Sequence, residues 1–204
     1  MNVIIIDYGM GNLGSVQRAL EQCSARCAIS SNPEDLTNAT HIILPGVGAF
    51  SEGMNQIHQR GWFTAIREAV FQNSMPLLGI CLGMQLLADI GDEGGKTSGL
   101  SLIPGEVCLL QPQSPKERIP HVGWNEIVKS GTNPIFNDIP DGSDFYFVHS
   151  YHFKVVNPQN IIATTAYCGE FSSAVSAGNV FGVQFHPEKS QRSGFQLLRN
   201  FLKQ

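Results

Sequence analysis

Short apolar runs alternate with segments of helical spacing along the first half of the chain. Residues 3–6 form a continuous β-branched run, which is typical of a strand that is covered on both faces. Further short strands are expected at residues 27–30, 41–44 and 76–78. Apolar residues recur at helical spacing in residues 16–23, 53–59, 62–72 and 86–89. This alternation predicts a doubly wound α/β arrangement with a mostly parallel central sheet.

The pattern changes from residue 106 onward, where apolar runs are broken by Pro, Gly and Asn. Strands are expected at residues 145–149, 161–167, 174–177 and 180–185, and a last helix at residues 195–202. The expected fold class is therefore α/β with three layers, flanking helices and additional antiparallel strands in the C-terminal half. Residues 91–99 and 111–118 are expected to be mobile surface loops. The length and the even composition indicate one domain, residues 1–204.

The charge balance argues against several classes of partner. The chain has 13 Lys and Arg against 17 Asp and Glu, a formal net charge of −4 at pH 7. We expect no polybasic surface for nucleic acid or anionic lipid, and no apolar run approaches the length needed to cross a bilayer. Five cysteines, an odd number without paired spacing, argue against a disulfide framework and favour a reducing compartment. The composition therefore predicts a cytoplasmic protein with no nucleic-acid, membrane, metal or cofactor site.

The turn after residue 78 carries the strongest chemical signal. It has the sequence GICLGMQ at residues 79–85, which places Cys81 between two glycines at a strand-to-helix turn. Glycine permits the strained backbone of such a turn and lets the residue between stand above the sheet. A thiol at a helix N-terminus is also favoured as the thiolate. Cys81 is a candidate nucleophile, and the alternative is a small buried apolar residue under a tight turn.

A second signal lies near the end of the chain, where FGVQFHPE occupies residues 181–188. His186 ends a strand pattern and is a candidate base. Glu188 follows it across a proline that fixes the turn, so the carboxylate can orient the imidazole. A lone histidine is more often structural, but this histidine and the cysteine turn together predict a triad of Cys81, His186 and Glu188.

A glycine-rich corner can supply the third requirement of acyl chemistry, which is a set of hydrogen-bond donors for a tetrahedral oxyanion. The sequence PGVGAF directly follows the strand expected at residues 41–44. Backbone N–H groups of this corner can face Cys81, unless the corner is an ordinary strand-to-helix turn. We expect an oxyanion hole at Gly46, Val47, Gly48 and Leu82.

Residues 9–14, GMGNLG, satisfy the G-x-G-x-x-G pattern of dinucleotide-binding loops after a strand and before a helix. Such a site also needs an acidic residue at the end of the second strand, but Glu34 and Asp35 come after a proline in the next loop. A nucleotide-binding module that uses Gly9, Gly11 and Gly14 is therefore an alternative. A tight turn at the carboxyl edge of the first strand is the favoured interpretation.

The segments PGVG at 45–48, GICLGMQ at 79–85 and HPE at 186–188 resemble the class I (triad) glutamine amidotransferases, over nearly the whole chain. Residues 7–13, 120–125 and 146–151 look like the glutaminase subunit of imidazole glycerol phosphate synthase, an enzyme of histidine biosynthesis. The resemblance implies a flavodoxin-like fold and hydrolysis of L-glutamine through a cysteine thioester. It also implies a heterodimer in which ammonia passes through a channel to a separate (β/α)8 barrel cyclase subunit.

The same resemblance implies roles for further polar residues. The substrate-binding residues expected are Gln85, His149, Ser150 and Tyr151. The partner interface is expected at Asn12, His121, Trp124 and Asn125. A Gln85 that faces solvent and a Trp124 that is a buried apolar anchor are the alternatives. Family members often carry arginine or another larger residue at the position of Gly14, so a paralogous glutaminase that feeds a synthase amidating a surface sugar is an alternative function.

Overall fold

The computed structural model describes residues 2–204. Its largest sheet has eight strands in the order β2-β1-β3-β4-β14-β13-β12-β9. The first five strands of that order are parallel to one another. They are β2 (Cys27–Ser30), β1 (Val3–Ile6), β3 (His41–Gly46), β4 (Leu77–Cys81) and β14 (Val180–Val183). The expected mostly parallel sheet is confirmed, and its order is that of flavodoxin-like folds.

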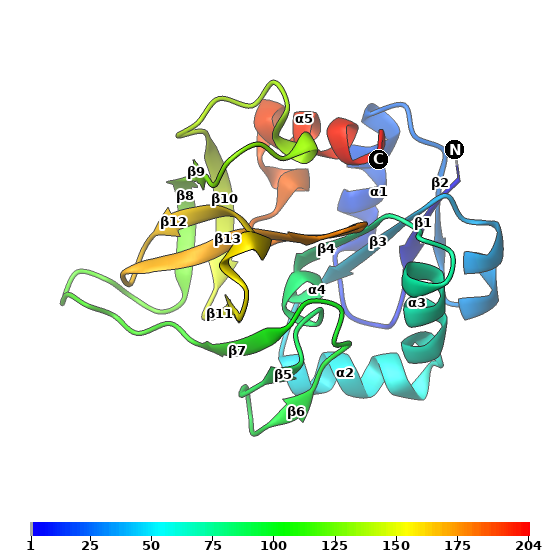
Figure 1. The fold of residues 1–204 in the computed structure, drawn as a ribbon, viewed down its shortest axis with the longest axis horizontal. Coiled ribbons are helices and arrows are strands. Elements are labelled where there is room, and N and C mark those ends of the chain that lie inside the picture. The colour runs from blue at the N-terminus through cyan, green and yellow to red at the C-terminus, as the bar shows by residue number, and fades with distance from the viewer. Residues whose placement is uncertain (1) are drawn as a thin grey trace.

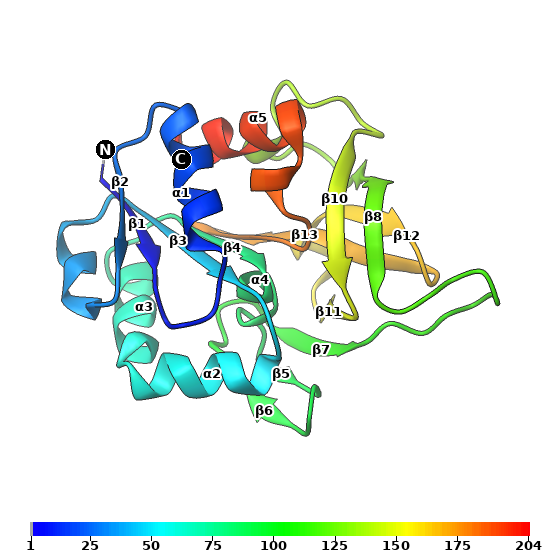
Figure 2. The same cartoon turned by 180° about the vertical axis from the view of Figure 1, so that it is seen from behind.

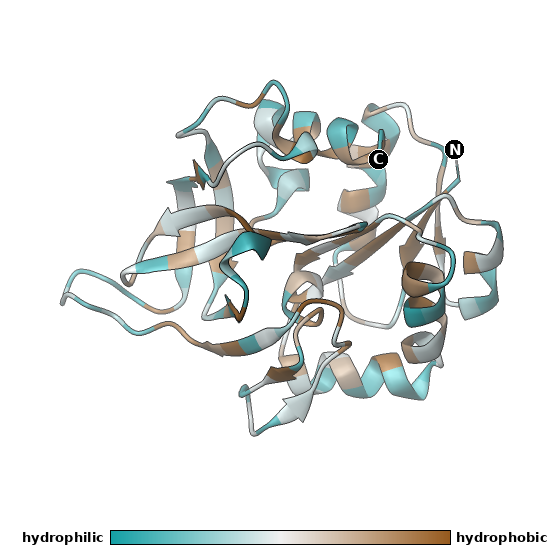
Figure 3. Ribbon diagram, in the orientation of Figure 1, coloured by the Kyte–Doolittle hydropathy of each residue, from teal (hydrophilic) through white to brown (hydrophobic). Residues whose placement is uncertain are grey.

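Four helices cover the parallel strands on two faces. Helices α1 (Leu13–Gln22) and α5 (Gln191–Phe201) lie on one face, and α2 (Phe50–Gln59) and α3 (Trp62–Phe71) on the other (Figure 1). Alternate residues of β1 enter the two resulting apolar cores, because Val3 and Ile5 pack with α1 and α5 while Ile4 and Ile6 pack with α2 and α3. This arrangement requires the continuous apolar run, and the central strands are largely brown in Figure 3. No described helix is long and apolar enough to cross a membrane.

Antiparallel strands form the other end of the molecule (Figure 2). The large sheet continues through β13 (Glu170–Ala177), β12 (Ile161–Ala166) and β9 (Val128–Lys129). A second sheet pairs β8 (His121–Glu126) with β10 (Asp144–His149). A third contains β11 (Tyr151–Val155), β7 (Gly105–Leu109), β5 (Ile90–Gly91) and β6 (Thr97–Ser98). Short 3-10 helices lie at Pro33–Asn38, Pro134–Phe136, Pro158–Asn160 and Pro187–Lys189.

Several elements differ from the sequence-based expectation. The helix after Cys81, α4, covers only Leu82–Gln85, although residues 86–89 were expected to be helical. The carbonyl groups of residues 86–89 accept hydrogen bonds from the backbone of residues 99–103, so they are not available to a helix. Residues 91–99 contribute to the β5–β6 pair rather than forming only a loop. Helices α1 and α5 begin earlier than expected; the first turn of α5, Gln-Arg-Ser-Gly, carries no apolar signal.

Candidate active site

A pocket of about 450 Å³ lies at the carboxyl edge of the parallel strands. Ligand sites of doubly wound sheets form at this edge. The walls come from the turns after β3 and β14, the junction of β4 with α4, and the segment that joins β10 to β11. The lining residues are Val47, Gly48, Ala49, Cys81, Leu82, Gln85, Glu93, Val148, His149, Ser150, Tyr151 and His186. Nearly all residues expected to carry chemistry therefore meet in one place.

Cys81 ends β4 in a strained conformation, with φ of 55° and ψ of −111°. Positive φ is rare for non-glycine residues and is found where surrounding structure imposes it. The flanking glycines are required here, because a Cβ at Gly83 would overlap the carbonyl group of Leu44 and one at Gly79 would lie 2.5 Å from the carbonyl oxygen of Gly83. The single turn of α4 gives only a small dipole, so this helix adds little to the stabilisation of a thiolate.

His186 lies in the turn after β14, with Nδ1 2.8 Å from Oε1 of Glu188. Both side chains are buried, at 4% and 2% exposure. Burial lowers the pKa of His186, but interactions with Cys81 and Glu188 outweigh burial and raise the pKa to about 10. The imidazole is therefore protonated at neutral pH. Among residues 2–204, Nε2 of His186 has no hydrogen-bond partner, and His186 lines the same pocket as Cys81.

The backbone of residues 46–48 closely approaches the turn that carries Cys81. Gly46 pairs with Cys81 between β3 and β4, and a Cβ at Gly46 would overlap the hydroxyl of Tyr8. Gly48 has φ of 109°, a conformation that L side chains rarely adopt. Within residues 2–204, the backbone N–H group of Val47 has no hydrogen-bond acceptor. Unpaired donors beside a nucleophile can bind a developing negative oxygen.

Glu93 lines the same pocket and was missed by the sequence analysis. Its Oε2 accepts a hydrogen bond from the N–H of Phe50, at the start of α2, at 2.8 Å. Glu93 lies between β5 and β6 in a Gly-rich polar segment that matches no motif. The pairing of β5 with β7 positions this segment, and such long-range pairing leaves no local sequence signal.

Gln85 and His149 are both committed to hydrogen bonds within the protein. Gln85 is 4% exposed rather than solvent-facing, and its Nε2 donates to the carbonyl oxygen of Tyr151 at 2.9 Å and to Oε1 of Gln184 at 3.0 Å. Nδ1 of His149 lies 2.9 Å from the same carbonyl oxygen, and its Nε2 lies 2.9 Å from Nδ1 of His121. Burial lowers the pKa of His149 to about 3 and that of His121 to about 4. Both rings are therefore neutral near pH 7.

Three of the four residues expected at a partner interface lie on β8, and they fall on both faces of that strand. Trp124 is 48% exposed rather than a buried anchor, and Asn12 lies at the surface. His121 is only 3% exposed, so its side chain offers little surface to a partner, and its place at the interface stays a prediction. Strand alternation turns His121 inward, where its ring stacks on Tyr167 at 3.9 Å between centroids. Asn125 is half-buried, and its Nδ2 lies 3.4 Å from Nε2 of His121.

The glycine loop of residues 9–14 is a tight turn, as the sequence favoured. Gly9 has φ of 92°, and its N–H donates to Oδ1 of Asp7 at 2.9 Å. The Asp7 carboxylate thus occupies a donor that a phosphate would use, and it adds a negative charge beside the loop. At the end of β2, Ser30 binds Asp35 at 2.6 Å, so this acid is engaged within the protein. The loop geometry therefore argues against the nucleotide alternative.

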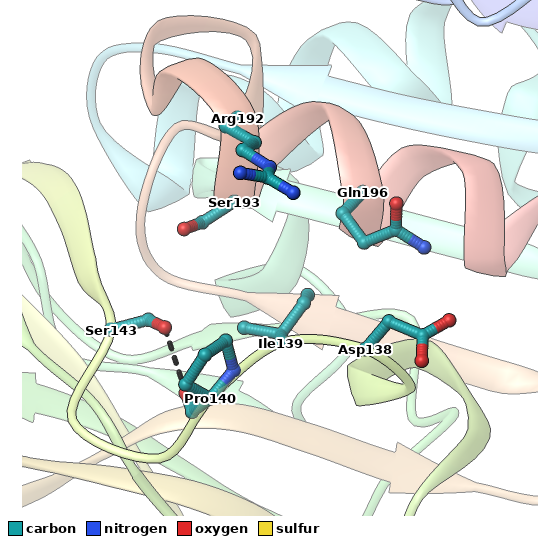
Figure 4. A pocket seen from close by; sticks show the side chains of 7 residues that line it. All are labelled: Asp138, Ile139, Pro140, Ser143, Arg192, Ser193 and Gln196. Atoms are coloured by element: carbon teal, nitrogen blue, oxygen red, sulfur yellow. Dashed lines mark hydrogen bonds between the residues drawn. The ribbon is translucent and has the colours of Figure 1, made fainter.

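A second cavity, of about 370 Å³, lies between the start of α5 and residues 138–143 (Figure 4). Arg192 and Gln196 of α5 line one side, and Ser143 on the other side donates a hydrogen bond to the carbonyl oxygen of Pro140 at 2.7 Å. This cavity shares no residue with the pocket of Cys81. Within residues 2–204, no group of three or more His, Cys, Asp or Glu side chains is arranged to hold a metal ion.

Comparisons with known proteins agree with this fold. The profile of the family described as glutamine amidotransferase class-I matches residues 4–204, and the chain belongs to this family. Imidazole glycerol phosphate synthase subunit HisH of Moorella thermoacetica is 48% identical over 98% of this chain and 93% of that protein. Subunit HisH 1 of Prochlorococcus marinus is 47% identical over 98% of this chain and 96% of that protein. A crystal structure of a glutamine amidotransferase is similar in fold, with a TM-score of 0.74 at 19% identity, over 98% of this chain and 97% of that chain.

Proposed function

We propose that this chain is the glutaminase subunit of an imidazole glycerol phosphate synthase, with Cys81, His186 and Glu188 as its catalytic triad. The observation that carries the proposal is the meeting of Cys81 with the His186–Glu188 pair at one pocket that is also lined by Val47, whose backbone N–H group has no acceptor within residues 2–204. The HisH relatives support histidine biosynthesis as the pathway. The subunit hydrolyses L-glutamine to glutamate, and the ammonia passes to the partner subunit.

The first half-reaction starts from a thiolate and a protonated imidazole. His186 carries its proton at neutral pH because its pKa is raised to about 10. Sγ of Cys81 attacks the side-chain carbonyl carbon of glutamine, and the N–H groups of Val47 and Leu82 bind the oxyanion. When the tetrahedral intermediate collapses, the C–N bond breaks and His186 donates its proton to the departing nitrogen. Ammonia leaves, and a glutamyl thioester remains on Cys81.

The second half-reaction uses the neutral imidazole that the first one produces. His186 takes a proton from water, and the water oxygen attacks the thioester carbonyl carbon. The C–S bond then breaks, which releases glutamate and restores both the thiolate of Cys81 and the protonated His186. Glu188 holds Nδ1 throughout the cycle, so Nε2 remains the nitrogen that exchanges protons.

Acceptor groups of the pocket are suited to the amino-acid end of glutamine. Glu93 presents a carboxylate to the pocket while one of its oxygens is held by the N–H of Phe50. A carboxylate binds the α-ammonium group through a charge-assisted hydrogen bond. Oε1 of Gln85 is a second acceptor, since Nε2 of that amide is already engaged. Neutral His149 adds no positive charge that would repel the ammonium group.

The proposed partner is a (β/α)8 barrel cyclase that forms a heterodimer with this chain. In bulk water near pH 7, ammonia becomes protonated and loses its nucleophilicity, so a closed path between the two subunits is chemically useful. An exposed apolar pair on β8 supports this face as the interface, because Val122 and Trp124 are 56% and 48% exposed. Aromatic side chains of this kind commonly anchor protein interfaces.

The partner is also proposed to control the oxyanion hole. Val47 is 44% exposed, and the positive φ of Gly48 gives this peptide a freedom that other residues lack. Rotation of the peptide between them can change which N–H group faces Cys81. A partner that favours the productive orientation only when its own ligand is bound would prevent wasteful hydrolysis.

The test measures glutamate release by the complex of this chain with a histidine-pathway cyclase, with and without the cyclase ligand. Cys81→Ser should reduce release at least about 1,000-fold, while the cyclase reaction supplied with ammonium salt is retained. Cys108→Ser is the matched control and should keep glutaminase activity. Undiminished release by Cys81→Ser would contradict the proposed nucleophile. Stimulation by a surface-sugar synthase and not by the cyclase would contradict the proposed partner.

A further inference from the structure

We propose that Gln184 stabilises the thiolate of Cys81 by donating a hydrogen bond from Nε2 to Sγ, an inference that rests on the proposed role of Cys81 as nucleophile. Gln184 directly follows β14 and is fully buried. Its Nε2 lies 3.7 Å from Sγ of Cys81, a separation suited to the large radius of sulfur. The residue therefore touches the reacting atom, although no motif singled it out.

The orientation of the Gln184 amide follows from a backbone carbonyl, which can only accept hydrogen bonds. The carbonyl oxygen of Tyr151 lies 2.9 Å from the amide of Gln85, so the nitrogen of Gln85 must face it. The same nitrogen lies 3.0 Å from the amide of Gln184 and has only hydrogens to offer, so the oxygen of Gln184 must face Gln85. The nitrogen of Gln184 is thereby directed to Cys81. If the nitrogen and oxygen of the Gln184 amide were exchanged, an N–H group of Gln184 would face the N–H group of Gln85, and no hydrogen bond could form.

A second donor holds the carbonyl group of Tyr151 in place. Nδ1 of His149 lies 2.9 Å from this oxygen and must carry the proton of the neutral ring. Nε2 of His149 is then an acceptor, and Nδ1 of His121 donates a hydrogen bond to it at 2.9 Å. While both imidazole rings are neutral, each proton in this series of hydrogen bonds can be on only one of the two atoms that it joins. The direction of the Gln184 amide is fixed by the same arrangement.

Two groups at the sulfur favour opposite protonation states. The carbonyl oxygen of Val148 lies 3.8 Å from Sγ and can accept only from the thiol, whereas the N–H of Gln184 favours the thiolate. The thiolate is the attacking group of the first half-reaction and the leaving group of the second, so the same donor assists both. The titratable groups around the sulfur are Tyr8, Glu93, His149, Tyr151, His186 and Glu188.

The test follows alkylation of Cys81 by iodoacetamide across a range of pH, measured by mass spectrometry of the Cys81 peptide from the full-length chain. Gln184→Met keeps the length and approximate volume of the side chain but removes the donor. The alkylation rate near pH 7 should fall about tenfold or more, and the pH midpoint of the rate should move to higher pH. Gln184→Glu should have a larger effect in the same direction, because a carboxylate oxygen then faces the sulfur.

Ser173→Ala is the matched control for these variants. The carbonyl oxygen of Ser173 accepts the backbone N–H of Gln184 at 2.9 Å, and its buried hydroxyl has no partner in the described part of the chain. This variant should be alkylated at the wild-type rate. A folded Gln184→Met with the wild-type rate and midpoint would overturn the inference, and Gln184→Glu decides the question if Gln184→Met does not fold. Wild-type protein that remains an active glutaminase after alkylation of Cys81 would overturn the proposed nucleophile instead.

Discussion

Nδ1 of His121 lies 2.9 Å from Nε2 of His149, and this hydrogen bond joins two buried, uncharged imidazoles behind the pocket of Cys81. Burial places both pKa values below the ordinary value of 6.5, at about 4 for His121 and about 3 for His149. The unfolded chain therefore binds protons first as the pH falls. The stability due to the neutral pair is fully present above pH 6.5 and is lost as the pH falls toward these values.

His121→Phe should keep the stacking on Tyr167 but remove the donor to His149. The buried Nε2 of His149 is then unsatisfied, which should cost about 1–3 kcal/mol of unfolding free energy at neutral pH. The loss of stability between pH 6.5 and about 4 should become shallower, because one titrating group has gone. Chemical denaturation at several pH values measures both effects. An unchanged dependence of stability on acid pH would contradict the prediction. The control variant is His58→Phe, at an exposed stacked histidine, and it should keep glutaminase activity.

The pH dependence due to His186 has the opposite sign. Its folded-state pKa is raised from 6.5 to about 10, so its stabilising contribution is present below pH 6.5 and is lost as the pH rises through about 10. Glu188→Gln keeps an acceptor for Nδ1 but removes the charge, so the pKa of His186 should fall. We expect glutaminase turnover to drop about 100-fold or more, and the alkaline loss of stability to be smaller and to end at lower pH. Steady-state rates and denaturation curves against pH test this. A Glu188→Gln protein with wild-type rates would contradict it.

Gly48→Ala should reduce the binding of the oxyanion while the protein still folds. An alanine at φ of 109° is strained, but its Cβ meets only the flexible end of Met10, at 2.7 Å. The protein should fold, and turnover should fall by about 100-fold if one oxyanion donor is displaced, with the KM for glutamine little changed. Single-turnover formation of the thioester measures the step directly. Wild-type turnover would contradict a role for this peptide.

Gly46→Ala is the informative contrast to that variant. A Cβ at position 46 would overlap the hydroxyl of Tyr8 and lie 2.9 Å from Cβ of Leu82 and 3.1 Å from the backbone nitrogen of Gly83. Backbone and packed side chains surround the position, so the variant should lose thermal stability as well as activity. Larger residues at Gly46 therefore do not test the peptide rotation by themselves.

Glu93→Gln should weaken glutamine binding with little loss of fold stability. The amide oxygen can still accept the N–H of Phe50, which Glu93 accepts at 2.8 Å, but the charge opposite the α-ammonium group is lost. The KM for glutamine should rise about 10-fold or more while kcat changes much less. Glu52→Gln, at an exposed position of α2, is the matched control. A fall in kcat at constant KM would contradict this assignment.

Trp124→Ala should weaken the complex with the cyclase. Truncation of a central interface tryptophan commonly costs about 2 kcal/mol or more, which is about a 30-fold increase in Kd. Isothermal titration calorimetry with the isolated partner measures this. Val156→Ala, at a residue that is 73% exposed and outside β8, should leave Kd unchanged. Equal Kd values for Trp124→Ala and wild type would contradict the assignment of β8 to the interface.

Features that depend on neighbouring residues could be predicted from the sequence. The branched run of β1 encodes a strand with two covered faces, and the glycines around Cys81 encode a turn with close backbone contacts. His186 and Glu188 are two residues apart, so the chain itself brings them together. These local constraints were sufficient to predict the central sheet and the residues proposed as a triad.

Features that depend on distant pairing could not be predicted in the same way. Glu93 reaches the pocket through strands that pair across the chain, and an isolated acid has no distinctive pattern. Gln184 lies within the FGVQFHPE segment, but only the pairing of β14 beside β4 brings its amide to Cys81. His121 was grouped with Trp124 at the expected interface because the segment was considered as a unit, whereas strand alternation sends the two side chains to opposite faces. The helix after Cys81 was overestimated because residues 99–103 compete for its carbonyl groups.

The acceptor that directs the amides behind Cys81 belongs to the main chain, so no replacement of the side chain at Tyr151 can delete it. Its position depends on the register of β11 against β7, where Tyr151 lies opposite Leu109. Redesign of the pocket for other amide substrates can therefore randomise the surrounding side chains without disturbing this oxygen. A one-residue slip of β11 would move it away, so the β7–β11 pair is the part of the scaffold that an engineer should leave untouched.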